Sequence, residues 1–212
     1  MTLGDIKLQS LKLMFAGNGK DIAAEDLDGL RDTEEYRDYL TGITGAVNRC
    51  FADLERKRVL PIRRFALRAD VGDSMDAFTA FDLVSLIGDF FDIERITYMR
   101  GNAYDGNVAY FREGNVIVIH DFDENAAYSV LYRPTIPRVM EWTSHDAEIG
   151  VPEGIAVCIP YFVKGELFRV DEPDEAAEAR NWYEAAMVEL AAGERTGGSE
   201  TGVRSVFDFS EV

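Results

Sequence analysis

Hydrophobic residues in the last third of the chain follow helical spacing. From Ile155 to Phe168 almost every residue is apolar, and a helix without a polar face is normally buried. An acidic turn containing Pro173 follows, and both proline and carboxylates favour the first turn of a helix. The next helix, from about Pro173 to Ala191, repeats apolar residues at three- and four-residue steps. Its apolar stripe comprises Ala176, Ala179, Trp182, Tyr183, Ala186, Met187 and Leu190. The pattern predicts a helical hairpin that needs partners.

Two more helices are predicted near the N-terminus. Thr2 can cap a helix from about Leu3 to Phe15, which has a broad apolar face and ends at a glycine-rich stretch. A second helix is expected from Asp32 to about Arg58, where apolar residues keep helical spacing.

Local signals mark the start and the interior of this second helix. Asp32 and Glu35 have the spacing of a capping box. Gly42 and Gly45 weaken the helix by about 1 kcal/mol each relative to alanine, or let another part of the chain come close.

The segment between the two helical blocks changes to the period of strands. Strands are predicted at 62–67, 94–100, 108–112, 116–122 and 127–132, with a hairpin at Glu113-Gly114-Asn115. The stretch from Phe81 to Phe91 fits a short helix better than strand alternation.

Together these elements predict an α+β fold, a helical bundle with a small antiparallel β-sheet insertion. Residues 1–60 supply the N-terminal helices of the bundle, 61–150 the β-rich insertion, 151–192 the helical hairpin that completes the bundle, and 193–212 a flexible tail. The bundle core is expected to bury Leu40, Val47, Leu54, Ile159, Phe162, Leu167, Trp182 and Tyr183 together.

The acidic excess of the chain limits the classes of function that the sequence allows. The 212 residues include 39 acidic and 22 basic ones, a formal net charge of -17. A protein that grips nucleic-acid phosphate needs a basic surface, so this balance argues against one. A surface that lets nucleic acid pass remains compatible with it.

Two features of the sequence indicate the cellular compartment in which the protein folds: its cysteines and its first residues. Cys50 and Cys158 lie among apolar residues, which predicts buried, reduced thiols. The first residues lack the basic start and apolar run of a signal peptide, and no stretch reaches the roughly 18 apolar residues of a membrane span. We therefore expect a protein that folds in a cytoplasm and has no membrane partner.

Candidate catalytic or metal-binding residues are few. His120 ends a predicted strand, and His145 stands beside Asp146 as a possible metal ligand. Asp121, Asp123 and Glu124 offer oxygen ligands, but the spacing and glycine of an EF-hand loop are missing. No phosphate-binding loop, dinucleotide fingerprint or Cys-x-x-Cys pair is present. The sequence predicts no enzyme and no cofactor; a hydrolytic or ligand-binding domain using Asp121, Asp123 and His145 stays as an alternative.

A basic run follows the second helix and forms a possible contact site for phosphate or for another subunit. It consists of Arg56, Lys57, Arg58, Arg63 and Arg64. Positive charge at a helix C-terminus also complements the helix dipole, so a purely structural role for these residues is the alternative.

The end of the chain combines a glycine-rich stretch with a short apolar segment. Gly193, Gly197, Gly198 and Gly202 give the stretch a flexible composition. Val206, Phe207 and Phe209 follow, and such a segment can add a strand to another protein or fill pockets on it. We expect these three residues to dock on a partner or on a neighbouring subunit.

Two groups of residues carry a resemblance to a known family. The first runs from Val47 to Glu55 and on to Val59-Leu60-Pro61, a helix that leads into a small β insertion. The second is Tyr128 to Pro134, Val151-Pro152-Glu153, Ile159-Pro160-Tyr161 through Leu167-Phe168, Asp171-Glu172-Pro173, Ala176 and Trp182-Tyr183. In this order the elements, over about residues 1–190, resemble the head–tail adaptor (connector, or head-completion) proteins of tailed bacteriophages.

This resemblance implies a structural protein of the virion neck, made in the host bacterial cytoplasm. Its copies would form a homo-oligomeric ring, twelve-fold by the same resemblance, between the portal protein and the tail or other neck proteins. The ring would complete the DNA-filled head and give DNA an acidic channel without sequence-specific binding, since a negative lumen repels phosphate. A neck or tail-completion ring protein farther from the portal is the nearest alternative.

Overall fold

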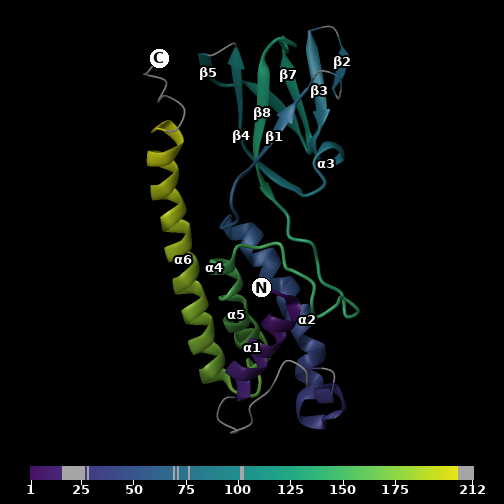
Figure 1. Cartoon of the computed structure of the whole chain (residues 1–212), viewed down its shortest axis with the longest axis vertical. Helices are drawn as coiled ribbons and strands as arrows, with labels where there is room; N and C mark the ends of the chain where they lie inside the picture. Colours follow the sequence, from purple (N-terminus) through teal and green to yellow (C-terminus); the bar gives the residue numbers. More distant parts are fainter. Residues whose placement is uncertain are drawn as a thin grey trace. The chain divides into compact units, whose positions relative to one another are not determined.

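The computed structural model describes residues 1–15, 27, 29–68, 70, 72–75, 77–100 and 103–204. It has the predicted α+β class (Figure 1). The chain divides into two compact units, which we call the helical unit and the β unit. The helical unit joins Met1–Val59 to the chain from Ile136 onward, and the β unit is Leu60–Thr135.

The helical unit is organised around a short apolar helix, α5. Its helices are α1 (Leu3–Phe15), α2 (Glu34–Lys57), α4 (Glu153–Ala156), α5 (Ile159–Leu167) and α6 (Pro173–Arg204), with a 3-10 turn at Gly29–Asp32. α5 packs against α1, α2 and α6. The predicted core residues Leu40, Val47, Leu54, Ile159, Phe162 and Tyr183 are buried, whereas Leu167 is half-buried.

Trp182 was predicted to lie in this core, and that prediction is wrong. Its side chain is 45% exposed. The buried α6 residues are Ala176, Ala179, Tyr183 and Met187, whose spacing defines the inward face. Trp182 precedes Tyr183 by one position, about 100° around the helix, so it stands at the edge of that face.

The predicted helix from Ile155 to Phe168 is divided into α4 and α5. Pro160 stands in the first turn of α5, where its missing N–H group costs no helical hydrogen bond. Val157, between the two helices, is 42% exposed and Tyr161 is half-buried, so this segment is not buried on all sides.

The starts of α1 and α2 differ in how well the sequence predicts them. At α1, the Thr2 hydroxyl accepts a hydrogen bond from the Asp5 amide at 3.1 Å, and the Asp5 carboxylate accepts one from the Thr2 amide at 2.8 Å. This reciprocal pair is a capping box with aspartate in place of glutamate. At α2 the N-cap position is Thr33, one residue after the expected Asp32, and its side chain makes no capping hydrogen bond.

The described residues of the β unit form two antiparallel sheets of four strands. One sheet has the order β1 (Arg63–Leu67), β8 (Ala127–Pro134), β4 (Phe90–Arg100), β5 (Ala103–Asn107). The other has the order β2 (Asp73–Met75), β3 (Phe78–Asp82), β7 (Val116–His120), β6 (Tyr110–Glu113). Residues from both sheets, including Val130, Ile96, Phe81 and Ile117, share one hydrophobic core.

This insertion is larger than the small sheet predicted. The hairpin at Gly114 is confirmed, and Gly114 takes a positive φ of 59°. Within Phe81–Phe91, however, only the turn α3 (Leu83–Leu86) is helical, and it is flanked by β3 and β4. The Asp82 carboxylate caps α3 by accepting hydrogen bonds from the Val84 amide and the Ser85 hydroxyl.

The β unit ends at Thr135, whereas the sequence placed the boundary at residue 150. The reason lies in polar side chains of α2. Glu55 accepts a hydrogen bond from the Ile136 amide at 2.8 Å, and Asn48 bonds the amide and the carbonyl of Val139 at 2.9 and 2.7 Å. These contacts hold the irregular segment 136–150 on the helical unit.

The last helix also departs from its predicted end. α6 continues to Arg204, although an end near Ala191 and a flexible tail from residue 193 were expected. The glycines of this stretch, each about 1 kcal/mol less favourable in a helix than alanine, do not end it. Val206, Phe207 and Phe209, which are expected to dock on the portal or on a neighbouring subunit, lie outside the described residues.

Candidate interaction surface

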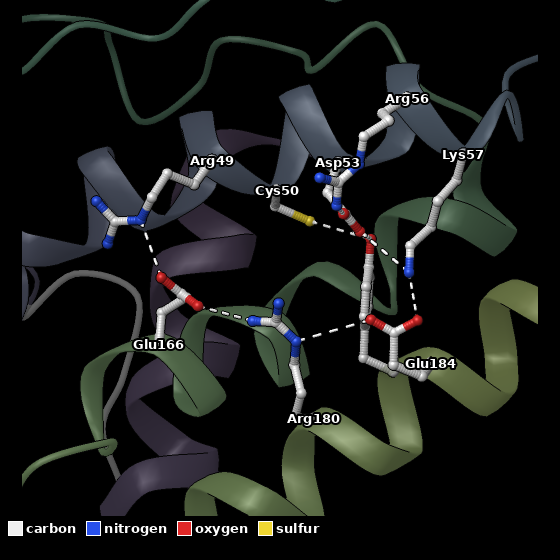
Figure 2. A network of polar contacts seen from close by, with 9 residues as sticks. Arg49, Cys50, Asp53, Arg56, Lys57, Glu166, Arg180 and Glu184 are labelled. Atoms are coloured by element: carbon white, nitrogen blue, oxygen red, sulfur yellow. Dashed lines mark hydrogen bonds and ion pairs between the residues drawn. The ribbon is translucent and has the colours of Figure 1, made fainter.

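A chain of alternating charges joins α2, α5 and α6 (Figure 2). Arg49 donates to Glu166 at 3.0 Å, and Arg180 donates to the other oxygen of Glu166 at 2.7 Å. Arg180 also lies 3.7 Å from Glu184, which accepts a hydrogen bond from Lys57. Because acids and bases alternate along the chain, each half-buried charge has an opposite neighbour.

Asp53 forms the buried end of this charge chain. Its carboxylate accepts a hydrogen bond from the Tyr183 hydroxyl at 2.9 Å and another from Arg56, and it lies 3.3 Å from the Lys57 ammonium. Burial raises the pKa of Asp53, but the Tyr183 hydrogen bond and the Lys57 charge outweigh it and hold this pKa below its ordinary value. Asp53 is therefore an ionised, fully partnered carboxylate.

The two nucleophile-type groups beside Asp53 are held in their neutral forms. Burial is the main cause that raises the pKa of the Tyr183 hydroxyl, and the nearby Cys50 and Asp53 raise it further. Burial also raises the pKa of the Cys50 thiol. A nucleophile needs its deprotonated form and access to a substrate. The arrangement therefore fixes α6 on α2 and does not activate either group.

The sequence missed Asp53 and Tyr183 as partners. One signal was present: an aspartate inside the apolar spacing of α2, with Arg56 and Lys57 three and four residues later. Such spacing allows ion pairs on one helix face. The tertiary partner Tyr183 could not be identified from that spacing.

The predicted basic site divides between the two units. In the helical unit, Arg56 and Lys57 belong to the charge chain, and Arg58 caps α2 in a left-handed conformation with a φ of 57°. In the β unit, Arg63 pairs with Asp89, and the Arg64 guanidinium donates to the Ser129 hydroxyl at 2.9 Å. A contact of these residues with phosphate or another subunit stays a prediction.

Arg64 also lines a hollow of about 710 Å³ in the β unit. Its lining carries both signs of charge, with Arg64 and Arg68 beside Asp70 and Glu124. Arg68 pairs with Asp70 at 3.2 Å, so the hollow is not uniformly basic.

The candidate catalytic and metal-binding residues are divided between the two units. In the β unit, the exposed His120 ring nitrogen lies 2.8 Å from Asp121, and Asp123 accepts a hydrogen bond from the Asn125 amide within a turn. In the helical unit, the His145 carbonyl accepts a hydrogen bond from the Gly4 amide at 2.8 Å.

Among the described residues, no three His, Cys, Asp or Glu side chains gather in a metal-binding arrangement. Within the same ranges, each helix is too short or too polar to cross a lipid bilayer.

An open apolar groove lies on the helical unit, between α1, α5 and α6. We call it the aromatic groove; it has a volume of about 430 Å³ and is lined by Gln9, Lys12, Leu13, Val157, Pro160, Tyr161 and Trp182. The rings of Tyr161 and Trp182 stack with centroids 3.7 Å apart and planes inclined by 19°. Aromatic side chains that are partly exposed in a groove are typical of protein-binding surfaces.

Comparison with known proteins gives no family for this chain. It matches no protein-family model and no curated protein.

Proposed function

We propose that this chain is a non-catalytic structural protein that assembles with copies of itself into a ring. In this proposal the ring is the adaptor between the portal and the tail of a tailed bacteriophage. It completes the DNA-filled head, lies in the virion neck and leaves a channel for DNA. The proposal combines the resemblance of the sequence motifs with the surface of the helical unit.

The aromatic groove is the observation that carries the self-assembly. Trp182 and Val157 are 45% and 42% exposed on one surface, which is costly for a protein that stays alone in water. Partly exposed aromatic and aliphatic side chains that line one groove are typical of protein contact surfaces. Covering the groove with another subunit removes Trp182 and Val157 from water.

The negative net charge favours a ring through which DNA passes and argues against a protein that binds DNA tightly. The net charge is -17, and two members of the basic run, Arg56 and Lys57, are paired with acidic groups of the same chain. Binding to DNA draws on lysines and arginines that are available to replace counterions. An acidic ring therefore repels the DNA that moves through it.

Sedimentation and electron microscopy test the proposal. The purified chain is expected to form rings visible by negative-stain microscopy, alone or after mixing with portal protein, and to co-sediment with the portal. Trp182→Glu places a charge in the aromatic groove and should reduce assembly. Trp142→Glu is the matched control, because Trp142 is 83% exposed and does not line the groove.

Two other outcomes would contradict or change the ring proposal. A chain that remains monomeric at high concentration, and that does not bind portal or tail proteins, contradicts the proposal. Binding to a purified tail protein without binding to the portal would assign the ring to a more distant position in the neck.

A further inference from the structure

We propose that the aromatic groove binds the C-terminal segment Val206–Phe209 of a neighbouring copy of this chain. The inference rests on the self-assembly in the proposed function and names the surfaces through which one copy holds the next. It joins two parts of the chain: a groove that the structure describes, and a sequence segment that follows the last described helix.

The chemistry of the groove and that of the segment match. Along an extended chain alternate side chains share a face, so Phe207 and Phe209 can enter the groove together while Asp208 faces the other way. The stacked rings of Tyr161 and Trp182 offer these phenylalanines aromatic surfaces.

Charge favours the same pairing. Glu211 shares the face of an extended segment that carries Phe207 and Phe209, and the groove lining includes the oppositely charged side chain of Lys12. Opposite charges speed the encounter of two surfaces and suppress the wrong partners.

The length of α6 assigns the segment to a different copy. Trp182 lies on α6, which continues to Arg204, a distance of about 33 Å at 1.5 Å per residue. Figure 1 shows α6 running along α5 and continuing beyond it. Phe209 follows Arg204 by five residues, and five extended residues span at most about 18 Å. The segment therefore cannot return to the groove of its own chain.

A contact between the groove of one copy and the end of the next is a head-to-tail contact. Such contacts close into rings when the rotation between copies permits it. Every copy then gives one segment and receives one, and two buried phenylalanines, worth roughly 1.5–3 kcal/mol each, act repeatedly around the ring.

Fluorescence of Trp182 gives the direct test. The receiving protein is the full chain with Trp142→Phe, which leaves Trp182 as its tryptophan, and with Phe207→Ala and Phe209→Ala to disable its own segment. The probe is a synthetic peptide of residues 205–212. We expect a saturable shift of the emission to shorter wavelength, and no shift with the same peptide carrying alanine at both phenylalanine positions. No saturable change with the natural peptide overturns the inference.

Assembly gives an independent readout. In the full chain, Phe207→Ala with Phe209→Ala, or Val157→Glu alone, should raise the concentration at half-assembly by at least about tenfold, or 1.4 kcal/mol. Val170→Glu is the control, because Val170 is 84% exposed and lies outside the groove lining. Circular dichroism confirms that each variant is folded.

The outcomes separate this inference from the proposed function. Rings that persist in the double phenylalanine variant overturn the inference and leave the ring proposal standing. A loss of assembly in Val157→Glu without a peptide effect on Trp182 also overturns it, since another surface of a second copy then fills the groove. A parent chain that never assembles, and whose Trp182 does not respond to the peptide, contradicts both.

Discussion

The Tyr183 hydroxyl on α6 donates a 2.9 Å hydrogen bond to the buried carboxylate of Asp53 on α2. These residues are 130 positions apart in the sequence. The bond therefore links α2 to α6, the last helix of the helical unit. Its loss should lower the free energy of unfolding of the whole unit.

Replacing Tyr183 with phenylalanine tests that link. Tyr183→Phe keeps the ring and removes the donor to an ionised group, so the free energy of unfolding should fall by about 1.5–3 kcal/mol. Urea denaturation at neutral pH measures the change. Tyr161→Phe, at a half-buried residue of α5 that lines the aromatic groove, is the control and should change the free energy by under about 0.5 kcal/mol. Equal stability of Tyr183→Phe and the parent would show that the bond contributes nothing.

Acid should weaken the protein partly through Asp53. Burial raises the pKa of this carboxyl, but its partners outweigh burial, so the pKa lies below the ordinary 3.8. As pH falls, Asp53 takes up its proton first in the unfolded chain, at a pH near the ordinary pKa of an aspartate. The stability supplied by ionised Asp53 is present above that pH and is lost as pH falls through the folded-state pKa.

Urea denaturation at a series of acidic pH values measures this dependence. Asp53→Asn should be less stable than the parent at neutral pH and should lose less stability on acidification. If both proteins lose stability with the same slope, Asp53 does not contribute to the acid sensitivity.

The two thiols should be protected in the folded protein. Cys50 and Cys158 are free and buried, and burial raises the pKa of both thiols. Because the thiolate is the reactive form, a disulfide reagent at mildly alkaline pH should label neither residue until the chain unfolds. Mass spectrometry before and after adding guanidinium chloride counts the labels. Rapid labelling of Cys50 in the native protein would contradict the packing of α2 against α6.

Two glycines on α2 should respond differently to alanine. Gly45→Ala should stabilise the protein by up to about 1 kcal/mol, since a Cβ there comes no closer than 3.6 Å, to the Arg49 guanidinium. A Cβ at Gly42 would lie 2.8 Å from the Leu167 side chain of α5. Gly42→Ala should therefore gain less, because Leu167 must move.

Thermal unfolding of both alanine variants measures this difference. Adding Leu167→Ala to Gly42→Ala removes the obstructing side chain, so a double-mutant cycle should show a favourable coupling between the two positions. Equal stabilisation by Gly42→Ala and Gly45→Ala would show that α5 does not constrain Gly42.

Local signals predicted much of the helical unit. The cap at Thr2 and the hydrophobic spacing of α1 and α2 depend on residues a few positions apart, so the sequence shows them directly. The hairpin at Gly114 is similarly local, because its turn needs a residue that tolerates a positive φ.

Features that depend on distant partners were not predictable in the same way. The segment 136–150 looks like a continuation of the β insertion, and it is Asn48 and Glu55, far earlier in the chain, that bind it to the helical unit. Trp182 fits the apolar stripe of α6 as well as Tyr183 does. Its exposure follows from where α5 and α2 contact that helix, which periodicity alone does not specify.

The helical unit is made of two stretches of chain that flank the β unit, and this arrangement sets an order of events during synthesis. All of Leu60–Thr135 has been translated before α5 begins at Ile159. The two sheets can therefore pack while the chain is still growing, since domains fold as units when their sequence becomes available. α1 and α2 must wait, with their apolar faces uncovered, until α5 leaves the ribosome. We expect the nascent chain to be most vulnerable to aggregation and to chaperone capture in that interval.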